Sequence, residues 1–520
     1  MQITYIGHAG FVVETEQAVL VTDPWLSPEG AFDSAWFQFP RNHDLAPIVR
    51  EKLGDPSRKR FVYISHEHRD HFDSNFLKSL PLGELSFILP HFQRDALRSE
   101  IGGLKPGELI LCKHGEEVAL PGGSSIKLYL DDSGINRDSS ILVRADGKAF
   151  LNLNDCKLHD QLPEICAAEG PISVFTCQFS GATWHPTCYA YEPEEYQSIS
   201  RKKLVNKFES VARAIETVRP RAFLPSAGPA CFLDPTLIHL NFEPVNIFPR
   251  TPLLFQYFRA RLPDCETLLL DIMPGDVVSA DTCQWDQRGT ERVNEQDFET
   301  YIYSYAARYQ GFFFQKQKPP SNEQAQQTLF QLRSALEEKL SAFELHDRLH
   351  VPLYFGLSDV PKKMLRIDFP SKTVEQVSDI SEADYYSLTA PSWQIIRVLD
   401  KAITWEEFAL TFRVRLNRRP DVYQTLIQGF LLLESEDMNW FCRRLLDIEQ
   451  SGERSIVEAG GIRYSIDRYC PHQGGDLSCG WAEEGRLWTC PRHRWQFALD
   501  KSGDCLTSGS SIHAVCLEND

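Results

Sequence analysis

Residues 61–73, FVYISHEHRDHFD, decide the fold of the N-terminal part of the chain. A run of β-forming residues leads directly into His66, His68, Asp70 and His71. Alternation along an extended chain places His66 and His68 on one side, and the following turn brings Asp70 and His71 toward them. Imidazoles and carboxylates are good metal ligands, so this spacing predicts a metal site. Chance clustering of surface histidines, or capping of a helix, is the alternative explanation.

The sequence His-x-His-x-Asp-His after a strand resembles the metallo-β-lactamase fold. The resemblance implies an α/β fold, an αββα sandwich, with a later bridging aspartate, for which Asp155 in NLNDC stands at the end of the β-rich run 148–153. Where the resemblance implies a third and a fourth histidine, the chain has Asp138 and Ser226. A dinuclear zinc hydrolase needs those imidazoles. The remaining set of histidines and carboxylates suits non-haem Fe(II) and dioxygen, with one or two irons.

A second group of ligand residues lies near the other end of the chain. YCPHQGGDLSCG and WTCPRHRWQF contain Cys470, His472, Cys490 and His493 in the pattern Cys-x-His, seventeen residues, Cys-x-x-His. Two thiolates and two imidazoles can bind a structural zinc, or a 2Fe-2S cluster with the cysteines on one iron and the histidines on the other.

The residues around this second group favour the cluster. Each ligand pair lies in a loop with proline, Gly474 and Gly475 allow close approach of the backbone, and Trp495 and Phe497 follow the second pair, as in the Rieske family that this segment resembles. Cys479 is not spaced as in high-potential Rieske proteins with a loop disulfide, which favours an oxygenase-type centre.

Length and composition agree with several packed domains. The chain has 520 residues, of which 42% are hydrophobic and 24% charged, and its formal net charge is 54 − 72 = −18. This charge does not favour a nucleic-acid partner, and neither a membrane span nor a signal peptide is recognisable, so a cytoplasmic location is expected. The expected domains are a metallo-β-lactamase-like iron-binding domain (1–290), a middle α+β region (291–436) and a small all-β Rieske domain (437–520).

Two helices are expected from the periodicity of apolar residues. The first runs from about residue 194 to 218, and the second starts after Ser321 as N-cap and ends near residue 345. In the middle region, VPLYFGL and MLRIDF are expected as strands, and WEEFALTF and DVYQTLIQGFLLL as helices.

The chain as a whole resembles the CMP-N-acetylneuraminate hydroxylases, which pair a Rieske domain with a metallo-β-lactamase-like domain. The stretches that carry the resemblance are TYIGHAG, TDPWL, YISHEHRDH, NLNDC, RKKLVNKF, VRPRAFLPSAG and LTFRVRLNRRPDVYQTLIQGF. In that family Asp also occupies the position of Asp138. One departure is the order of the domains: the Rieske domain here follows the metallo-β-lactamase-like domain, whereas in that family it precedes it. Another is His185, which has no family counterpart and is expected to be a pocket acid or base, an extra ligand, or a plain loop residue.

The resulting prediction is a Rieske-dependent non-haem iron monooxygenase acting on a small molecule with O2. The resemblance implies a nucleotide sugar such as a CMP-sialic acid, with Arg201, Lys202, Lys203 and Arg250 as candidate phosphate partners or merely solvated charges. N-oxygenation or another oxidative step on a different metabolite stays open. Two rivals are a metallo-hydrolase with a regulatory Rieske domain, and an electron-transfer protein with a degenerate first site.

Reducing equivalents must come from outside, because no dinucleotide fingerprint and no haem-attachment motif is recognisable. A ferredoxin, a flavoprotein reductase or a b-type cytochrome is the expected donor. A homodimer, in which one chain's Rieske domain serves the partner's iron, is expected as well.

Overall fold

The computed structural model describes residues 1–94, 96–132, 137–483 and 485–517. Its chain divides into two compact units. Of the described residues, the first unit comprises 1–94, 96–132, 137–182 and Gln197–Gln310. Of the described residues, the second comprises Thr183–Tyr196, 311–483 and 485–517.

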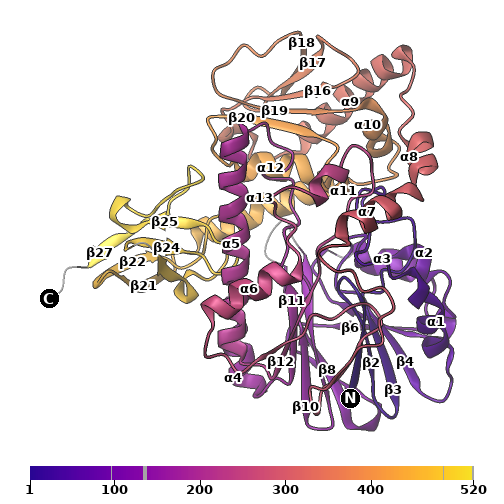
Figure 1. The fold of residues 1–520 in the computed structure, drawn as a ribbon. Coiled ribbons are helices and arrows are strands. Elements are labelled where there is room, and N and C mark those ends of the chain that lie inside the picture. Colours follow the sequence, from indigo (N-terminus) through magenta and orange to yellow (C-terminus); the bar gives the residue numbers. More distant parts are fainter. Residues whose placement is uncertain (95, 133–136, 484, 518–520) are drawn as a thin grey trace. The chain divides into compact units, whose positions relative to one another are not determined.

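Two β-sheets form the centre of the first unit (Figure 1). Within the described residues, one sheet has the order β15-β14-β1-β2-β3-β4-β5-β6. Its strands are β1 (Gln2–Gly7), β2 (Gly10–Glu14), β3 (Ala18–Thr22), β4 (Lys59–Tyr63), β5 (Ser86–Pro90), β6 (Glu108–Cys112), β14 (Val277–Ser279) and β15 (Trp285–Asp286). The other sheet has the order β13-β12-β11-β10-β9-β8-β7. Its strands are β7 (Glu117–Leu120), β8 (Ser124–Asp131), β9 (Asp138–Ala145), β10 (Lys148–Asn152), β11 (Val174–Gln178), β12 (Ala222–Ser226) and β13 (Leu268–Leu269).

Helices cover the outer face of each sheet. The first sheet packs on α1 (Ala46–Gly54), α2 (Ser74–Leu77) and α3 (Ala96–Gly103). The second packs on α4 (Leu162–Glu169), α5 (Pro193–Val218) and α6 (Thr251–Arg261). Side chains such as Phe11, Tyr63 and Phe150 fill the space between the sheets. The predicted αββα sandwich is therefore confirmed, and the apolar stripe expected from about residue 194 forms α5.

The direction of the strands explains why polar residues meet at one edge of the sandwich. β3 pairs with β4 in parallel, and β4 with β5 in parallel. β1 is antiparallel to β2, which is antiparallel to β3, so β1 runs the same way as β3. The carboxyl ends of β1, β3 and β4 consequently reach the same edge, where the loops that follow them can converge.

The second unit contains an α+β part. Its sheet has the order β18-β17-β16-β19-β20, with β16 (Leu353–Leu357), β17 (Met364–Asp368), β18 (Thr373–Val377), β19 (Tyr385–Ala390) and β20 (Arg415–Arg419). Its helices are α9 (Asn322–Ala342), α10 (Ser392–Leu399), α11 (Trp405–Leu410), α12 (Thr425–Leu432) and α13 (Ser435–Gln450). Two short helices precede them along the chain, α7 (Phe298–Ala307) and α8 (Gln310–Lys316). Ser321 caps α9 in a capping box with Gln324, as its position before the apolar stripe predicts.

Two small sheets form the C-terminal part of the second unit. One has the order β21-β22-β27, with β21 (Arg454–Ala459), β22 (Ile462–Asp467) and β27 (Val515–Leu517). The other runs from β23 to β26, with β23 (Trp481–Glu483), β24 (Leu487–Thr489), β25 (Gln496–Ala498) and β26 (Asp504–Cys505). The small β-rich C-terminal domain is thus present, and the boundaries at residues 290 and 436 stay predictions. Among the described helices, none combines the length and the hydropathy needed to cross a membrane.

The packing of α12 on α13 gives a stability prediction. A Cβ atom added at Gly429 would lie 2.3 Å from Cε1 of the buried Phe441. Gly429→Ala should therefore lower the free energy of unfolding by about 1–3 kcal/mol, as overpacking does. Gly311→Ala is the matched control, because a Cβ at that position of α8 meets open space. Thermal unfolding followed by circular dichroism measures both, and equal midpoints would contradict the prediction.

Candidate metal centres

The first candidate site lies where the strands of the first unit end. His8 follows β1, Asp23 follows β3, and Asn154 with Asp155 follows β10. His8, Asp23 and Asn154 have φ angles of 51°, 37° and 54°. This left-handed backbone region is sparsely populated by residues other than glycine and is frequent at functional sites.

The segment with three histidines is a loop rather than an extension of β4. The strand ends at Tyr63, and the amides of His71 and Phe72 both donate to the carbonyl of His68, at 3.0 and 2.7 Å. These two hydrogen bonds close a turn that starts at His68 and carries Asp70 and His71. Asp73 then caps α2 by accepting from the amide of Phe76.

His71 is oriented from behind by a carboxylate. Its Nδ1 lies 2.8 Å from Oδ2 of Asp23, which also accepts from the Ser65 hydroxyl. The other ring nitrogen, Nε2, lies 3.1 Å from Oδ1 of Asp155 and 4.0 Å from Oδ2 of Asp70. A carboxylate that accepts a hydrogen bond from one ring nitrogen, as Asp23 can, fixes the tautomer and the orientation of a histidine whose other nitrogen binds a metal.

Among the described residues, two groups have ligand atoms close enough to share a metal ion. One is His8, Asp70 and His71, and the other is His66, His71 and Asp155; within each group the ligand atoms lie within 4.8 Å of one another. His71 belongs to both groups. His8 Nε2 also lies 3.0 Å from Asp70 Oδ2.

His68 and Asp138 lie beside His66. His68 Nδ1 is 2.9 Å from His66 Nε2, the nitrogen that also faces Asp155 at 4.0 Å. Asp138 Oδ1 is 3.2 Å from the opposite nitrogen, Nδ1. Asp138 thus lies beside the nitrogen of His66 that faces away from Asp155 and belongs to neither ligand group, so its predicted role as a metal ligand stays a prediction.

The position at which a fourth histidine was expected carries Ser226 at the end of β12. Its hydroxyl oxygen is buried and accepts a hydrogen bond from the Thr176 hydroxyl. This position therefore supplies no imidazole, and the donor set remains richer in carboxylates than that of a zinc hydrolase.

The mutual electrostatics of the site favour a bound cation. Burial alone would raise the pKa of Asp70, but the imidazoles of His71 and His8 lower it to about 2. Burial alone would likewise lower the pKa of His71, but Asp155 and other carboxylates raise it to about 9. Burial raises the pKa of Asp138 to about 6, despite the neighbouring His66. The carboxylates thus attract positive charge, and a metal ion would take the place of the protons.

Three buried ligand atoms of this site form no hydrogen bond within the described structure. They are Oδ1 of Asp70, Nε2 of His71 and Oδ1 of Asp155. Buried polar atoms are normally satisfied, and all three face the shared ligand space. The residues present therefore fit a metal ion.

One member of this site was not predicted from the sequence. His8 contacts Asp70, and its ring lies edge-on to that of His71 at 5.2 Å between centroids. The signal available in the sequence is a histidine in GHAG directly after a buried strand, without a second ligand at a recognisable spacing.

His185 lies in the second unit, not with the histidines of the first site. Its Nε2 is 2.9 Å from Oη of Tyr191 and 3.4 Å from a guanidinium nitrogen of Arg418. Tyr191 donates to Asp421 at 2.9 Å. The predicted role of His185 as a ligand or pocket acid stays a prediction.

The second candidate site lies on two loops of the C-terminal β-rich part. Cys470 and Cys490 are fully buried, and the rings of His472 and His493 lie 4.6 Å apart between centroids. Burial and a hydrogen bond with Cys490 raise the pKa of the Cys470 thiol well above its ordinary value. Iron would remove this penalty, because cluster ligands are thiolates.

Both ligand loops are tightly turned around the two thiols. The amide of Cys470 donates to the Gly475 carbonyl, and the amide of Cys490 donates to the Trp495 carbonyl. A Cβ added at Gly475 would lie 3.1 Å from Sγ of Cys490. Gly475 therefore allows a close approach of the backbone to this thiol, whereas a Cβ at Gly474 would meet Ile448, and the four residues fit a 2Fe-2S cluster.

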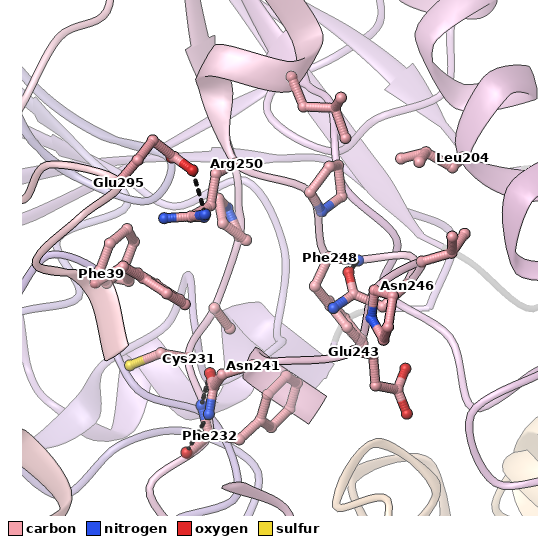
Figure 2. Close-up of a pocket in the computed structure, with 17 residues that line it drawn as sticks. Phe39, Leu204, Cys231, Phe232, Asn241, Glu243, Asn246, Phe248, Arg250 and Glu295 are labelled. Carbon is pink, nitrogen blue, oxygen red and sulfur yellow. Dashed lines mark hydrogen bonds and ion pairs between the residues drawn. The ribbon is translucent and has the colours of Figure 1, made fainter. Parts of the chain in front are cut away.

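A cavity of about 250 Å³ lies elsewhere in the first unit, among the residues of Figure 2. Arg250 lines it, but its guanidinium pairs with Glu295 and lies 4.0 Å over the ring of Phe298. Glu243 also lines the cavity. Two carboxylates with one arginine weaken the expectation that Arg250 is a phosphate partner.

Comparison with known proteins identifies both domains. Residues 431–512 match the model of the Rieske [2Fe-2S] domain, and residues 2–129 match that of a beta-lactamase superfamily domain. A protein of Mycobacterium tuberculosis, provisionally named a Rieske 2Fe-2S iron-sulfur protein, is 28% identical over 98% of each chain. The cytidine monophosphate-N-acetylneuraminic acid hydroxylase of Xenopus laevis is 23% identical over 81% of this chain and 70% of its own.

Among solved structures, the diiron beta-hydroxylase CmlA of Streptomyces venezuelae is 13% identical and covers 52% of this chain and 53% of its own, with a TM-score of 0.34. So low a score carries no argument about function. The two domain matches confirm the predicted order, with a metallo-β-lactamase-like domain first and a Rieske domain at the C-terminal end. The cofactor of a Rieske domain is a 2Fe-2S cluster.

Iron content can test the first site separately from the second. In a Cys490→Ala chain, which lacks a cluster ligand, the iron that remains bound after anaerobic reconstitution should belong to the first site. Adding His71→Ala should remove that iron, because His71 is a member of both ligand groups. Adding His185→Ala should leave it in place, since His185 bonds to Tyr191 in the other unit. Iron quantitation measures all three chains, and unchanged iron in the His71 variant would contradict the assignment.

Proposed function

We propose that this protein is a Rieske-dependent non-haem iron monooxygenase that hydroxylates a small metabolite with O2. The observation that supports it is the presence of two separate donor sets in one chain, a His and Asp cluster at a strand edge and a Cys and His set on two loops. A Rieske cluster passes single electrons and makes no bonds itself, so the first site is where the electrons are used.

Iron is proposed for the first site because its donors are imidazoles with several carboxylates. Ser226 offers a hydroxyl where a zinc hydrolase would have an imidazole. When bound, an iron with open positions would supply dioxygen activation. The protein's own contribution is orientation, since Asp23 holds His71 and Asp138 holds His66, each by the nitrogen that faces away from Asp155.

The proposed substrate class is a nucleotide sugar related to CMP-sialic acid, following the name of the Xenopus laevis relative. Lys207 is the cation proposed to pair with such an anionic substrate. Its Nζ donates to the side-chain oxygen of Gln178 at 2.7 Å. The backbone amide of Gln178 donates to the carbonyl of Asn154, the neighbour of Asp155. Burial and the charge of Lys157 lower the pKa of Lys207 to about 8. Because the Rieske domain follows the first domain, N-oxygenation or another oxidative step on a different metabolite is the alternative.

A metallo-hydrolase with a regulatory Rieske domain is the rival from another class. Zinc-activated water would serve such an enzyme. The two proposals differ in what turnover requires: two bound zincs and product formation without O2 or reductant would favour the hydrolase. An electron-transfer protein with a degenerate first site is disfavoured by the buried, convergent ligand atoms around His71.

Replacing His66 tests the proposal. His66→Ala should lower O2-dependent product formation by more than about 100-fold, because even outer-shell partners of a metal are worth roughly 10–100-fold. The visible spectrum of the reduced and oxidised cluster should stay unchanged, since the cluster ligands belong to the other domain. Turnover is measured with CMP-sialic acid and a ferredoxin with its reductase. His114→Ala, an exposed histidine of the same unit, is the control. Full activity in the His66 variant would end the proposal.

Mixed dimers test whether electrons are delivered across a subunit boundary. Combining a His66→Ala chain with a Cys490→Ala chain should recover activity, because each chain supplies the site that the other lacks. No recovery in demonstrated mixed dimers would show delivery within one chain, or a cluster that does not feed the first site.

A further inference from the structure

Tyr423 reaches the Rieske ligands from outside the C-terminal β-rich part of the second unit. It lies between β20 and α12, in the α+β part. Its Oη is 3.3 Å from Nε2 of His472. Its ring is edge-on to those of His472 and Trp495, at 5.5 and 5.4 Å between centroids. Trp495 stacks on His472 at 4.3 Å with an angle of 14°. The imidazole is therefore held on one face by Trp495 and at its outer nitrogen by Tyr423.

The backbone around Tyr423 is fastened on both sides. Its amide donates to the carbonyl of Thr507 at 2.8 Å, within the Rieske domain. Tyr386 of β19 donates its hydroxyl to the carbonyl of Val422 and accepts from the amide of Gln424 at 2.9 Å. The position of the phenol oxygen is thus set by the α+β sheet, not by the flexibility of a loop.

The same loop is fixed further upstream by a cluster of polar side chains. Arg418 pairs with Asp421 at 2.5 Å. Asp421 accepts from Tyr191, which in turn contacts His185. Through Tyr191, His185 thus contacts the loop that carries Tyr423 and helps to anchor it.

The contact assigns roles to the two nitrogens of His472. Because Nε2 is engaged by Tyr423, Nδ1 is the nitrogen that an iron would take. A metal-bound histidine commonly donates its other ring N–H to a neighbouring acceptor, which orients the ring and makes the imidazole a stronger ligand. The phenol oxygen of Tyr423 is the acceptor in this pair.

We propose that Tyr423 is a positioning residue for the Rieske cluster, which fixes the His472 ring and lowers the reduction potential of the cluster by accepting the Nε2 hydrogen. A stronger imidazole donor stabilises the oxidised iron relative to the reduced iron. The inference rests on His472 as a cluster ligand and not on oxygenase chemistry. Its failure and the failure of the proposed function are therefore distinguishable.

Tyr423→Phe removes the oxygen and keeps the ring that packs on Trp495. At a fixed ambient potential, the ratio of reduced to oxidised cluster should rise about two- to tenfold, the worth of one ordinary hydrogen bond. The measurement is an anaerobic redox titration of the full-length protein, followed by electron paramagnetic resonance and visible absorption, without O2 or substrate. Tyr464→Phe is the matched control, because Tyr464 is a buried tyrosine in the core of the same domain. It should leave the ratio unchanged.

A second variant keeps the proposal testable if Tyr423→Phe does not hold a cluster. Tyr386→Phe removes the hydroxyl that fastens the backbone on either side of Tyr423 and touches no ligand of the cluster in the described structure. It should shift the ratio in the same direction by a smaller factor. No change of the ratio in Tyr423→Phe, or a change no larger than that of Tyr464→Phe, would overturn the proposal. If only Tyr386→Phe holds a cluster, an unchanged ratio there would overturn it equally.

Discussion

The first unit must bury several charged and polar side chains together at the carboxyl ends of its strands. This requirement constrains how its strands and turns are arranged. Nε2 of the buried His71 lies 4.0 Å from Asp70 and 3.1 Å from Asp155, so that two carboxylates share one imidazole. A cation held by His71 together with either carboxylate would satisfy atoms of this site that make no hydrogen bond. The left-handed turns at His8 and Asp23 are the structural cost of bringing these side chains together.

The sandwich supplies the rigidity that such a site needs. Parallel pairing of β3 with β4 places Asp23 beside the Ser65 amide, which donates to it at 2.8 Å. The same carboxylate holds His71. One buried aspartate therefore connects strand register to the orientation of a ligand ring, so a slip of the register would misplace both.

In the Rieske domain, two short loops position the ligand side chains. Its two ligand loops supply the sulfur and nitrogen atoms and a close glycine turn, but the outer nitrogen of His472 is covered by a residue of the α+β part. The middle region is then more than a spacer, because it contributes to the surroundings of the cluster. Its lack of ligand residues in the sequence does not mean that it lacks influence on the redox centre.

Sequence patterns predicted the parts of this molecule that depend on local spacing. The helix α5, the Ser321 cap and the Rieske domain all follow from residues close in the chain. His8 was missed because a lone histidine has no partner at a recognisable spacing. The contact between Tyr423 and His472 joins residues 49 positions apart and depends on how two sheets pack, which no local pattern encodes.

In the proposed chemistry, electrons pass from the Rieske cluster to the first site, so the reduction potentials of the two sites matter together. Carboxylate ligands stabilise the higher oxidation state of a metal, so a site rich in aspartates is hard to reduce. Its donor must then have a low potential of its own. A histidine-ligated cluster is a higher-potential donor than an all-cysteine one, and a hydrogen bond accepted from His472 Nε2 moves it back toward lower potential. On the proposed function, the carboxylates around His71 and the phenol beside His472 act on the same quantity, the driving force for one-electron transfer between the two centres.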